Sequence, residues 1–369
     1  MTTSAHGLVI GKFHPPHRGH ELLVRTAAHA CRRVSVLVLG HPDEALTVED
    51  RVAWVAETVA DLDHVVVAGG VDPHPIDYHD PAVWDLHERE FRTVLAGITD
   101  EPVTAVFASE RYGVELARRF DARAVLVDPE RELVPVSATL VREDPIAAWE
   151  YLPPPVRAGL CRRVVVLGAE STGTTTLARS LADVLRARGG PHGETQWVPE
   201  VGRAWTVTKM AQAIAAAALA GHPRPSMDDL AWPTDDFVAI AAQQNSDEDR
   251  LARRGGPVLV CDTDAFTTGI WHERYVGAPA PAVDALARPH PLYLLTHPDG
   301  VPFEQDGIRD GEHLRGWMTD RFVEALAATG RRTVVLHGTL DERLATAVDA
   351  VDGLLAEGWD LSISQDAFT

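Results

Sequence analysis

Apolar and polar positions follow one another along the chain in blocks that are typical of a parallel α/β protein. Leu8, Val9 and Ile10 form a short apolar run, which a turn rich in Gly and His and a helix-like stretch over residues 21–31 follow. Residues 163–167 (RVVVL) form a second run, followed by a turn rich in Gly, Ser and Thr and by helix-like sequence over 175–188. A buried strand, a glycine turn and a helix open a parallel α/β domain. Two such openings predict two α/β domains in series.

Further apolar runs predict the remaining strands of each sheet. In the first domain, the expected strands are residues 34–39, 65–67, 103–108 and 124–127, with helices over 48–61 and 85–96. In the second domain, they are residues 258–261, 292–295 and 333–336, with a final amphipathic helix over 341–357. Three consecutive prolines, Pro153, Pro154 and Pro155, continue neither a helix nor a central strand. The sequence therefore predicts domains over 1–155 and 156–369, with the proline-rich residues 221–234 as a loop and a frayed tail beyond Trp359.

Composition and charge exclude several classes of function. The chain has 369 residues and a formal net charge of −20, which argues against general binding of nucleic acid or of an anionic membrane. The three cysteines, Cys31, Cys161 and Cys261, are far apart and in no metal-binding spacing, as in a reducing cytosol. Residues 213–220 are the most apolar stretch and are too short to span a bilayer. These features, and a start that lacks a secretory signal pattern, predict a cytoplasmic protein.

The turn after the first strand carries the first candidate chemistry. The sequence GKFHPPHRGH fits the pattern G-x-F-x-P-x-H-x-G-H at six positions, Gly11, Phe13, Pro15, His17, Gly19 and His20. A helix that begins near Gly19 presents free N–H groups, which bind phosphate. His17 and His20 are three residues apart and can face the same phosphate, where imidazole N–H donors would stabilise developing charge. The pattern resembles the signature of the HIGH-type nucleotidyltransferase superfamily.

That superfamily has a second motif, [IV]-S-S-T-x-x-R, near the end of its domain. Residues 136–142 (VSATLVR) are similar to it, with Ala138 in place of the second serine. The resemblance implies that Ser137 caps a short helix and that Arg142 reaches the β- and γ-phosphates of ATP. Taken alone, the same residues would be an ordinary helix cap and a surface charge.

The turn after residues 163–167 resembles a phosphate-binding loop. GAESTGTTT fits G-x-x-x-x-G-K-[ST] at Gly168, Gly173 and Thr175, but Thr174 stands where the lysine should be. The backbone amides can still hold phosphates and the Thr175 hydroxyl can still bind Mg²⁺. The missing lysine would normally bridge the β- and γ-phosphates.

Other segments narrow the resemblance to NadR-type proteins, which join a nicotinamide-mononucleotide adenylyltransferase to a ribosylnicotinamide kinase. In the first half these are residues 11–23, 49–54, 106–110 and 127–142, and in the second half GAESTG, VPEVGR, CDTDAFTT and PFEQDGIRDGE. The resemblance covers roughly residues 7 to 350. It implies a Rossmann-like nucleotidyltransferase domain followed by a P-loop kinase-like domain. No helix-turn-helix of the kind that some NadR proteins carry is expected, so a DNA-binding regulator is disfavoured.

The resemblance also implies roles for particular residues. Catalytic roles fall on His17, His20, Arg142, Asp262 and Asp264, and Mg²⁺ would bind Thr175 and Asp262. The nicotinamide substrates would contact Trp84, Glu200 and Arg203, although a core position is an equal alternative for Trp84 and a helix cap is one for the two aspartates. ATP would contact Gly11, Lys12, Phe13, Ser137, Thr139, Gly168, Glu170, Ser171, Thr172, Gly173, Thr174, Thr175, Thr176, Arg309 and Arg315, with the last two in a lid over the phosphates.

The expected function is the synthesis of NAD from ATP and nicotinamide mononucleotide, coupled to phosphorylation of nicotinamide riboside. Two alternatives remain open: a second domain that senses nucleotides without turnover, or an adenylyltransferase for another acceptor, such as a pantetheine or flavin phosphate. The expected partners are small nucleotides and Mg²⁺, with no nucleic acid and no membrane, and a homo-oligomer stays open.

Overall fold

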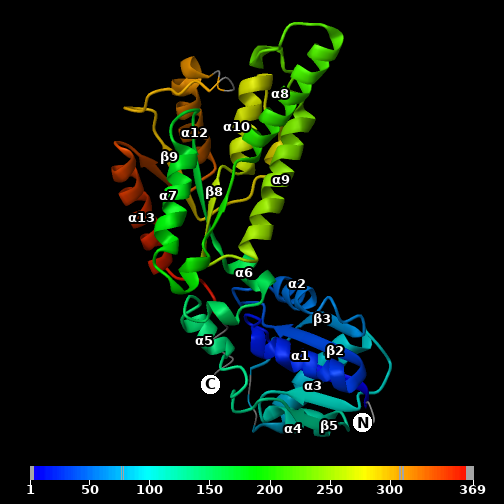
Figure 1. Ribbon diagram of the computed structural model, residues 1–369. Coiled ribbons are helices and arrows are strands. Elements are labelled where there is room, and N and C mark those ends of the chain that lie inside the picture. Colours follow the sequence, from blue (N-terminus) through cyan, green and yellow to red (C-terminus); the bar gives the residue numbers. More distant parts are fainter. Residues whose placement is uncertain (1–3, 76, 78, 307–308, 310, 363–369) are drawn as a thin grey trace. The chain divides into compact units, whose positions relative to one another are not determined.

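The computed structural model describes residues 4–75, 77, 79–306, 309 and 311–362. The chain forms two compact units (Figure 1). Unit 1 comprises Met1–Gly159 together with Trp359–Thr369, and unit 2 comprises Leu160–Gly358. Each unit is built on one five-stranded parallel sheet. The expectation of a Rossmann-like domain followed by a P-loop kinase-like α/β domain is confirmed.

Unit 1 has the strand order β3-β2-β1-β4-β5, so the chain reverses direction across the sheet beside β1. Its strands are β1 (Ser4–Gly11), β2 (Cys31–Gly40), β3 (Val65–Val71), β4 (Ala105–Ala108) and β5 (Arg123–Leu126). Its helices are α1 (Arg18–Ala30), α2 (Val48–Thr58), α3 (Pro81–Ala96), α4 (Tyr112–Arg119), α5 (Ala138–Glu143) and α6 (Pro154–Leu160), whose last residue begins unit 2.

Alternating residues of the central strands divide the core of unit 1 into two layers. Val9 and Phe107 pack on one face of the sheet, against α1 and α2. Leu8 and Val106 pack on the other face, against α3 and α4. Both faces of β1 are therefore buried, which is why its sequence is a continuous apolar run.

Unit 2 has the strand order β10-β9-β6-β8-β7, and here the chain reverses beside β6. Its strands are β6 (Arg162–Gly168), β7 (Gln196–Val198), β8 (Val258–Asp262), β9 (Leu292–Thr296) and β10 (Thr333–Leu336). Its helices are α7 (Thr174–Arg186), α8 (Val201–Ala220), α9 (Thr234–Ala252), α10 (Ala265–Val276), α11 (Pro281–Asp284), α12 (Arg315–Ala328) and α13 (Leu340–Ala356). Ligands of such folds bind at the carboxyl ends of the strands where the order reverses. That rule selects the turns after β1 and β6.

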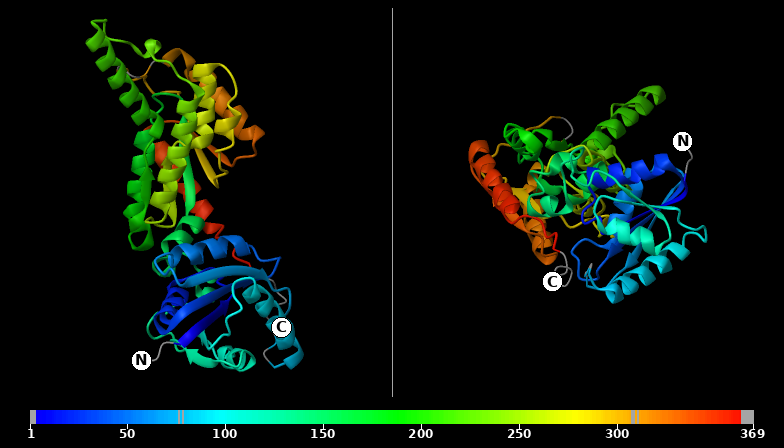
Figure 2. Two further views of the ribbon diagram at one scale, coloured as in Figure 1. Left: turned by 90° about the vertical axis from the view of Figure 1, so that its right-hand side faces the viewer. Right: turned by 90° about the horizontal axis from the view of Figure 1, so that it is seen from below.

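The long helices of unit 2 differ from the sequence prediction. Helices α8 and α9 run side by side and project beyond the sheet (Figure 2). Neither helix was predicted. The Ala-rich α8 buries no residue and so lacks the apolar stripe by which a helix is recognised. The expected loop over 221–234 connects them, with only a short helical turn at Met227–Asp229. Among the described residues, no helix is both long and apolar enough to cross a membrane.

The boundary between the units also differs in detail. Pro154 and Pro155 are the first residues of α6, where a missing N–H costs no helical hydrogen bond. The break in secondary structure expected at the three prolines is therefore wrong, and the units divide after Gly159.

The described part of the tail belongs to unit 1 and is not frayed. Leu361 is 4% exposed, and the Ala45 amide donates a 3.2 Å hydrogen bond to the Ser362 carbonyl. Residues 363–369 lie outside the described part of the chain.

Leu361→Ala is expected to destabilise unit 1, although Leu361 follows all of unit 2 in the sequence. Leucine-to-alanine changes at buried sites cost about 2–5 kcal/mol, and this edge position should lie near 2. Thermal unfolding followed by limited proteolysis would show early cleavage within residues 4–159. Early cleavage within residues 160–358 instead would contradict the assignment of the tail.

Candidate active sites

A cavity of about 330 Å³ lies at the carboxyl end of β1, at the point where the strand order of unit 1 reverses. Seven of the predicted residues line it: Gly11, Lys12, Phe13, His20, Trp84, Thr139 and Arg142. Two predicted residues, His17 and Ser137, do not. The two sequence motifs, about 120 residues apart, therefore meet at one cavity.

Backbone hydrogen bonds fix the proton position on the two motif histidines. His17 is the N-cap of α1, and its Nδ1 accepts a 3.2 Å hydrogen bond from the Gly19 N–H. His20 Nδ1 accepts a hydrogen bond of the same length from the His17 N–H. A backbone N–H can only donate, so each Nδ1 is unprotonated and each neutral ring carries its proton on Nε2. The rings stack with centroids 3.7 Å apart, which leaves His20 as the one of the pair that lines the cavity.

Burial keeps both rings neutral. It lowers the pKa of His17 to about 3, with help from the positive charges of Arg131 and Arg142. Burial also places the pKa of His20 well below its usual value. A neutral imidazole still offers the Nε2–H donor, so the site can stabilise phosphate charge without an imidazolium.

We expect both rings to stay neutral in the folded protein from pH 8 down to about pH 5. Because only the unfolded chain then takes up these protons, unit 1 should lose stability as pH falls below about 6.5, by about 1.4 kcal/mol per pH unit for each ring. Histidine ring NMR, assigned with His17→Gln and His20→Gln, measures the protonation directly. A ring that titrates near pH 6.5 would contradict the expectation for that residue.

The second motif places a guanidinium beside the histidine turn. Ser137 caps α5 by accepting a 3.1 Å hydrogen bond from the Leu140 N–H, as expected. Arg142, in the last turn of α5, donates to the His14 carbonyl at 2.8 Å and to the Thr139 hydroxyl at 3.0 Å. The link between Arg142 and His14 joins the two motifs across the cavity.

The sequence motifs did not predict a buried ion cluster beneath the turn. The Glu44 carboxylate is 2.9 Å from Arg51 and 2.8 Å from Lys12, and Arg51 also donates to the Lys12 carbonyl at 2.7 Å. Arg51 is fully buried. The only signal was the segment 49–54, in which Arg51 occurs on the face of α2 that turns toward the core. Glu44 thus holds Lys12 at the cavity wall.

Trp84 occupies a core position that also borders the cavity. Trp84 packs in the core layer against α4 and is 6% exposed, yet it also lines the cavity. Beside it, His87 Nδ1 lies 2.6 Å from an Asp72 carboxylate oxygen, and His87 Nε2 donates to the Pro75 carbonyl at 3.0 Å. These contacts attach the loop after β3 to α3 and close one wall of the cavity.

Unit 2 has a larger cavity, of about 780 Å³, at the carboxyl end of β6. The loop between β6 and α7 forms one wall, with Gly168, Glu170, Ser171, Thr174, Thr175 and Thr176 in its lining. Gly173 (φ 86°) and Ser171 (φ 58°) adopt the left-handed conformation that curls the loop. Gly168 has no room for a Cβ, which would collide with the Thr172 and Thr296 hydroxyls. Thr172 is buried beneath the loop and does not line the cavity.

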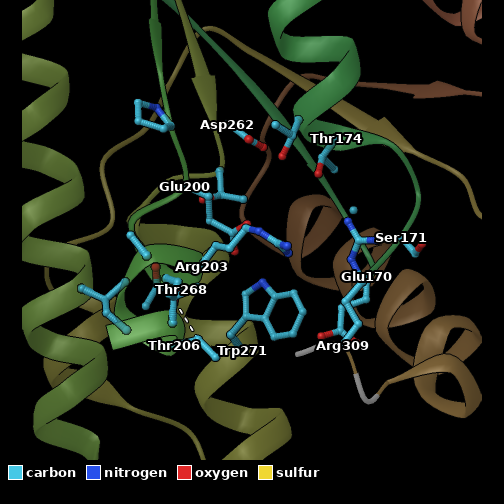
Figure 3. Close-up of a pocket in the computed structure, with 18 of the residues that line it drawn as sticks. Glu170, Ser171, Thr174, Glu200, Arg203, Thr206, Asp262, Thr268, Trp271 and Arg309 are labelled. Atoms are coloured by element: carbon cyan, nitrogen blue, oxygen red, sulfur yellow. Dashed lines mark hydrogen bonds between the residues drawn. The ribbon is translucent and has the colours of Figure 1, made fainter. Parts of the chain in front are cut away.

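Two carboxylates line this cavity, those of Asp262 and Glu200 (Figure 3). Asp262, the last residue of β8, is 1% exposed, and its carboxylate lies beside the Thr174 and Thr175 hydroxyls. Burial raises the pKa of Asp262 although these two hydroxyls lower it, and burial beside Asp262 also raises the pKa of Glu200. Such buried, mutually repelling carboxyl groups are typical of functional sites.

The prediction that Asp264 also acts in this site is wrong. Asp264 is fully buried and does not line the cavity. Its carboxylate caps α10, accepting hydrogen bonds from the Thr267 N–H at 2.8 Å and the Thr267 hydroxyl at 2.7 Å. The Tyr293 hydroxyl donates to its other oxygen at 3.2 Å. The structural alternative raised for the aspartate pair therefore describes Asp264, whereas Asp262 lines the cavity and its predicted role stays a prediction.

The two predicted lid arginines lie in different places. Arg309 lines the cavity and pairs with Glu304 at 3.2 Å. Arg315 does not line it and donates instead to the Val301 and Ser171 carbonyls, at 3.0 and 3.2 Å. Residues 307, 308 and 310 of the predicted lid segment lie outside the described part of the chain. The expectation that Arg315 reaches the phosphates directly is therefore not met.

The cavity of unit 2 holds further residues that no motif indicated. Arg203 lines it as expected and pairs with Asp306 at 2.5 Å, while Arg179, which was not predicted, lies 4.4 Å from the Trp197 ring centroid. The remaining wall is aromatic: Trp197, Trp232, Phe237, Trp271 and Tyr275. These residues come from the short strand β7, the loop before α9, and the helices α9 and α10, so no local pattern could gather them.

The residues present fit a divalent cation. The buried Asp262 carboxylate and the Thr175 hydroxyl lie side by side and both line the cavity, and hard oxygen ligands of this kind suit Mg²⁺. A second group with ligand chemistry, His297, Asp299 and His337, has its ligand atoms within 4.8 Å of one another near the ends of β9 and β10.

Comparison with known proteins agrees with these observations. Residues 163–343 match the family described as AAA domain. The chain is 26% identical over 374 residues to the trifunctional NAD biosynthesis/regulator protein NadR of Salmonella typhimurium, covering 95% of this chain and 83% of that protein. It is also 26% identical over 323 residues to the protein of the same name from Escherichia coli, covering 82% and 71%.

Two solved structures share the fold of the whole chain. A NadR protein in complex with NR has a TM-score of 0.65 at 21% identity, covering 96% of each chain. A NadR protein in complex with NAD and AMP-PNP has the same TM-score at 22% identity, covering 95% and 96%. Fold and sites together define a two-unit nucleotide-binding α/β protein with a P-loop second unit. In sequence and in fold, the chain is similar to these NadR proteins, as its motifs indicated.

Proposed function

We propose that the chain is a bifunctional enzyme of NAD synthesis. Unit 1 transfers the adenylyl group of ATP to nicotinamide mononucleotide, and unit 2 phosphorylates nicotinamide riboside to supply that mononucleotide. The observation that carries the proposal is the similarity to NAD biosynthesis proteins over 95% of the chain, with the matching motifs gathered at one cavity in each unit. The ligands NR, NAD and AMP-PNP of the solved NadR proteins support the same substrate classes.

In unit 1, the acceptor phosphate attacks the α-phosphorus of ATP, and pyrophosphate leaves. The phosphate is already ionised at neutral pH, so the step needs no general base. His20 directs its Nε2–H at the transferring phosphate, and the Arg142 guanidinium binds the leaving β- and γ-phosphates. The α1 N-terminus adds the positive end of its helix dipole. Catalysis then consists of orientation and charge stabilisation.

In unit 2, a hydroxyl of the riboside attacks the γ-phosphorus of ATP, and ADP leaves. The amides of the loop over residues 168–175 bind the phosphates, and the Asp262–Glu200 pair accepts the hydroxyl proton. Mg²⁺ held by Thr175 and Asp262 would neutralise phosphate charge. Arg203 and Arg309 line the same cavity as the loop, where they can orient the transferred group.

A screen of phosphorylated acceptors with ATP, following pyrophosphate release, tests the proposal for unit 1. Nicotinamide mononucleotide should be the best acceptor, ahead of pantetheine and flavin phosphates. Release of pyrophosphate with one of those acceptors, and none with the mononucleotide, would favour another adenylyltransferase.

One observation favours a second candidate function for unit 2. Thr174 removes the lysine that follows phosphate charge during transfer, so unit 2 could bind ATP without turnover. ADP release that depends on nicotinamide riboside separates the two candidates, because adenylyl transfer releases pyrophosphate and no ADP.

A further inference from the structure

Two arginines hold the outer side of the phosphate-binding loop of unit 2. Arg315, at the start of α12, donates to the Ser171 carbonyl at 3.2 Å. Arg343, in α13, donates to the Thr172 carbonyl at 2.9 Å and to the His297 carbonyl at 2.8 Å. Arg343 is 3% exposed. Two consecutive carbonyls of the loop thus each accept a hydrogen bond from a guanidinium.

The charges of these two arginines are not cancelled locally. Among the described residues, neither Arg315 nor Arg343 forms an ion pair with a carboxylate, and both donate their hydrogen bonds to backbone carbonyls. Of the three arginines that line the cavity, Arg203 and Arg309 are paired with Asp306 and Glu304, and Arg179 lies over the Trp197 ring. Positive charge without a carboxylate partner therefore also lies behind the loop, at Arg315 and Arg343.

Each of these carbonyls belongs to a peptide group whose other end is an N–H of the loop. The Ser171 carbonyl shares a peptide group with the Thr172 N–H, and the Thr172 carbonyl shares one with the Gly173 N–H. A charged donor on a carbonyl polarises its peptide group and makes the N–H at the other end a stronger donor. In a buried setting, the full charge also acts through a low effective dielectric.

We propose that Arg315 and Arg343 are positioning residues that supply, through the peptide groups of the loop, the positive potential that Thr174 cannot supply. The inference rests on the proposed function of unit 2 as an ATP site. It gives the missing lysine a replacement from outside the cavity, on the opposite side of the loop from the substrate.

The test asks whether the loop needs the positive charge of each arginine or only a hydrogen-bond donor at that position. Arg315→Gln and Arg343→Gln keep an amide donor for the carbonyl and remove the charge, whereas Arg315→Lys and Arg343→Lys keep the charge. Arg188→Gln is the matched control, because it removes a charge paired with Asp352 at the far end of α7. Calorimetry would measure the affinity of the full chain for AMP-PNP and AMP with Mg²⁺, with NAD present to occupy unit 1.

We expect each glutamine variant to bind AMP-PNP about tenfold more weakly, with a smaller loss for AMP, which carries fewer charges. The lysine variants and Arg188→Gln should stay near wild type. Adding Thr174→Lys to Arg315→Gln should restore most of the lost affinity, because it returns the charge to the loop itself. If the arginines had a purely structural role, the lysine variants would not keep the wild-type affinity for AMP-PNP, and Thr174→Lys would not restore the affinity lost in Arg315→Gln.

Wild-type affinity in the glutamine variants, lysine variants as weak as glutamine, or no rescue by Thr174→Lys would each overturn the inference while the proposed function stands. If Arg343→Gln does not fold, the three Arg315 proteins decide the question, because Arg315 is only half-buried. A wild-type chain that binds no AMP-PNP in unit 2 would overturn the proposed function of that unit, and the inference with it.

Discussion

His20→Ala is expected to lower the rate of adenylyl transfer by about 10²–10³-fold while the fold of unit 1 is retained, because removal of one preorganised donor to a developing phosphate charge has this effect. His20 lines the cavity and accepts the His17 N–H at Nδ1, which leaves its Nε2–H for the transferring phosphate, so the loss should appear in kcat more than in KM. NAD formation from ATP and nicotinamide mononucleotide measures it. His29→Ala, an exposed change in the same helix, is the control.

His17→Ala should combine two effects, because His17 caps α1 as well as stacking on His20. Loss of the cap costs about 1 kcal/mol. Without the stacked His17 ring, the His20 ring is also held less firmly against the backbone N–H that fixes its tautomer. Far-UV circular dichroism separates unfolding from a loss of rate. Near-normal NAD synthesis by His20→Ala would refute its catalytic role, whatever His17→Ala does.

The strands that carry the sites were predictable because both faces of each are buried. Residues 8–10 and 163–167 are continuous apolar runs, and each ends in a turn whose glycines and hydroxyls are unusual enough to be noticed. Strand β7 was not predicted, because its three residues are too few to show the alternation of apolar and polar positions that marks a strand. The boundary was misplaced by a few residues because proline is as compatible with the first turn of a helix as with a break.

The sites were predictable only as far as they are local in sequence. The histidine turn, α5 and the phosphate-binding loop each occupy fewer than a dozen residues, and the structure brings the first two to one cavity. Their partners come from far along the chain: Arg343 reaches Thr172 across 171 positions, and Asp306 reaches Arg203 across 103. Composition and spacing carry no information about such pairs.

The aspartates after β8 show the same limit at short range. Asp262 and Asp264 are two residues apart, and the sequence offered both as ligands. Thr263 between them has a φ of 67°, and this left-handed residue begins the turn into α10, where Asp264 is held as a cap. Only the backbone conformation distinguishes the carboxylate that lines the cavity from the one that caps the helix.

Asp262→Asn is accordingly expected to lower riboside phosphorylation by about 10²–10⁴-fold, since it removes the ionisable partner of the substrate hydroxyl and the carboxylate ligand of the metal. The change is isosteric and unit 1 is untouched, so adenylyl transfer in the same sample should be unaffected and serves as the internal control. ADP release with nicotinamide riboside measures the loss.

The stability of the same variant gives an independent check. Burial raises the pKa of Asp262, so the folded state loses stability as pH rises through the range in which only the unfolded carboxyl ionises readily. Without Mg²⁺, Asp262→Asn should therefore unfold at a higher temperature than wild type at pH 7, and the difference should shrink toward pH 4. Asp264→Ala should do the opposite and destabilise unit 2 by about 1–2 kcal/mol, because it removes the α10 cap. An Asp262→Asn protein that is less stable than wild type at pH 7 and still phosphorylates the riboside would show that Asp262, like Asp264, is structural.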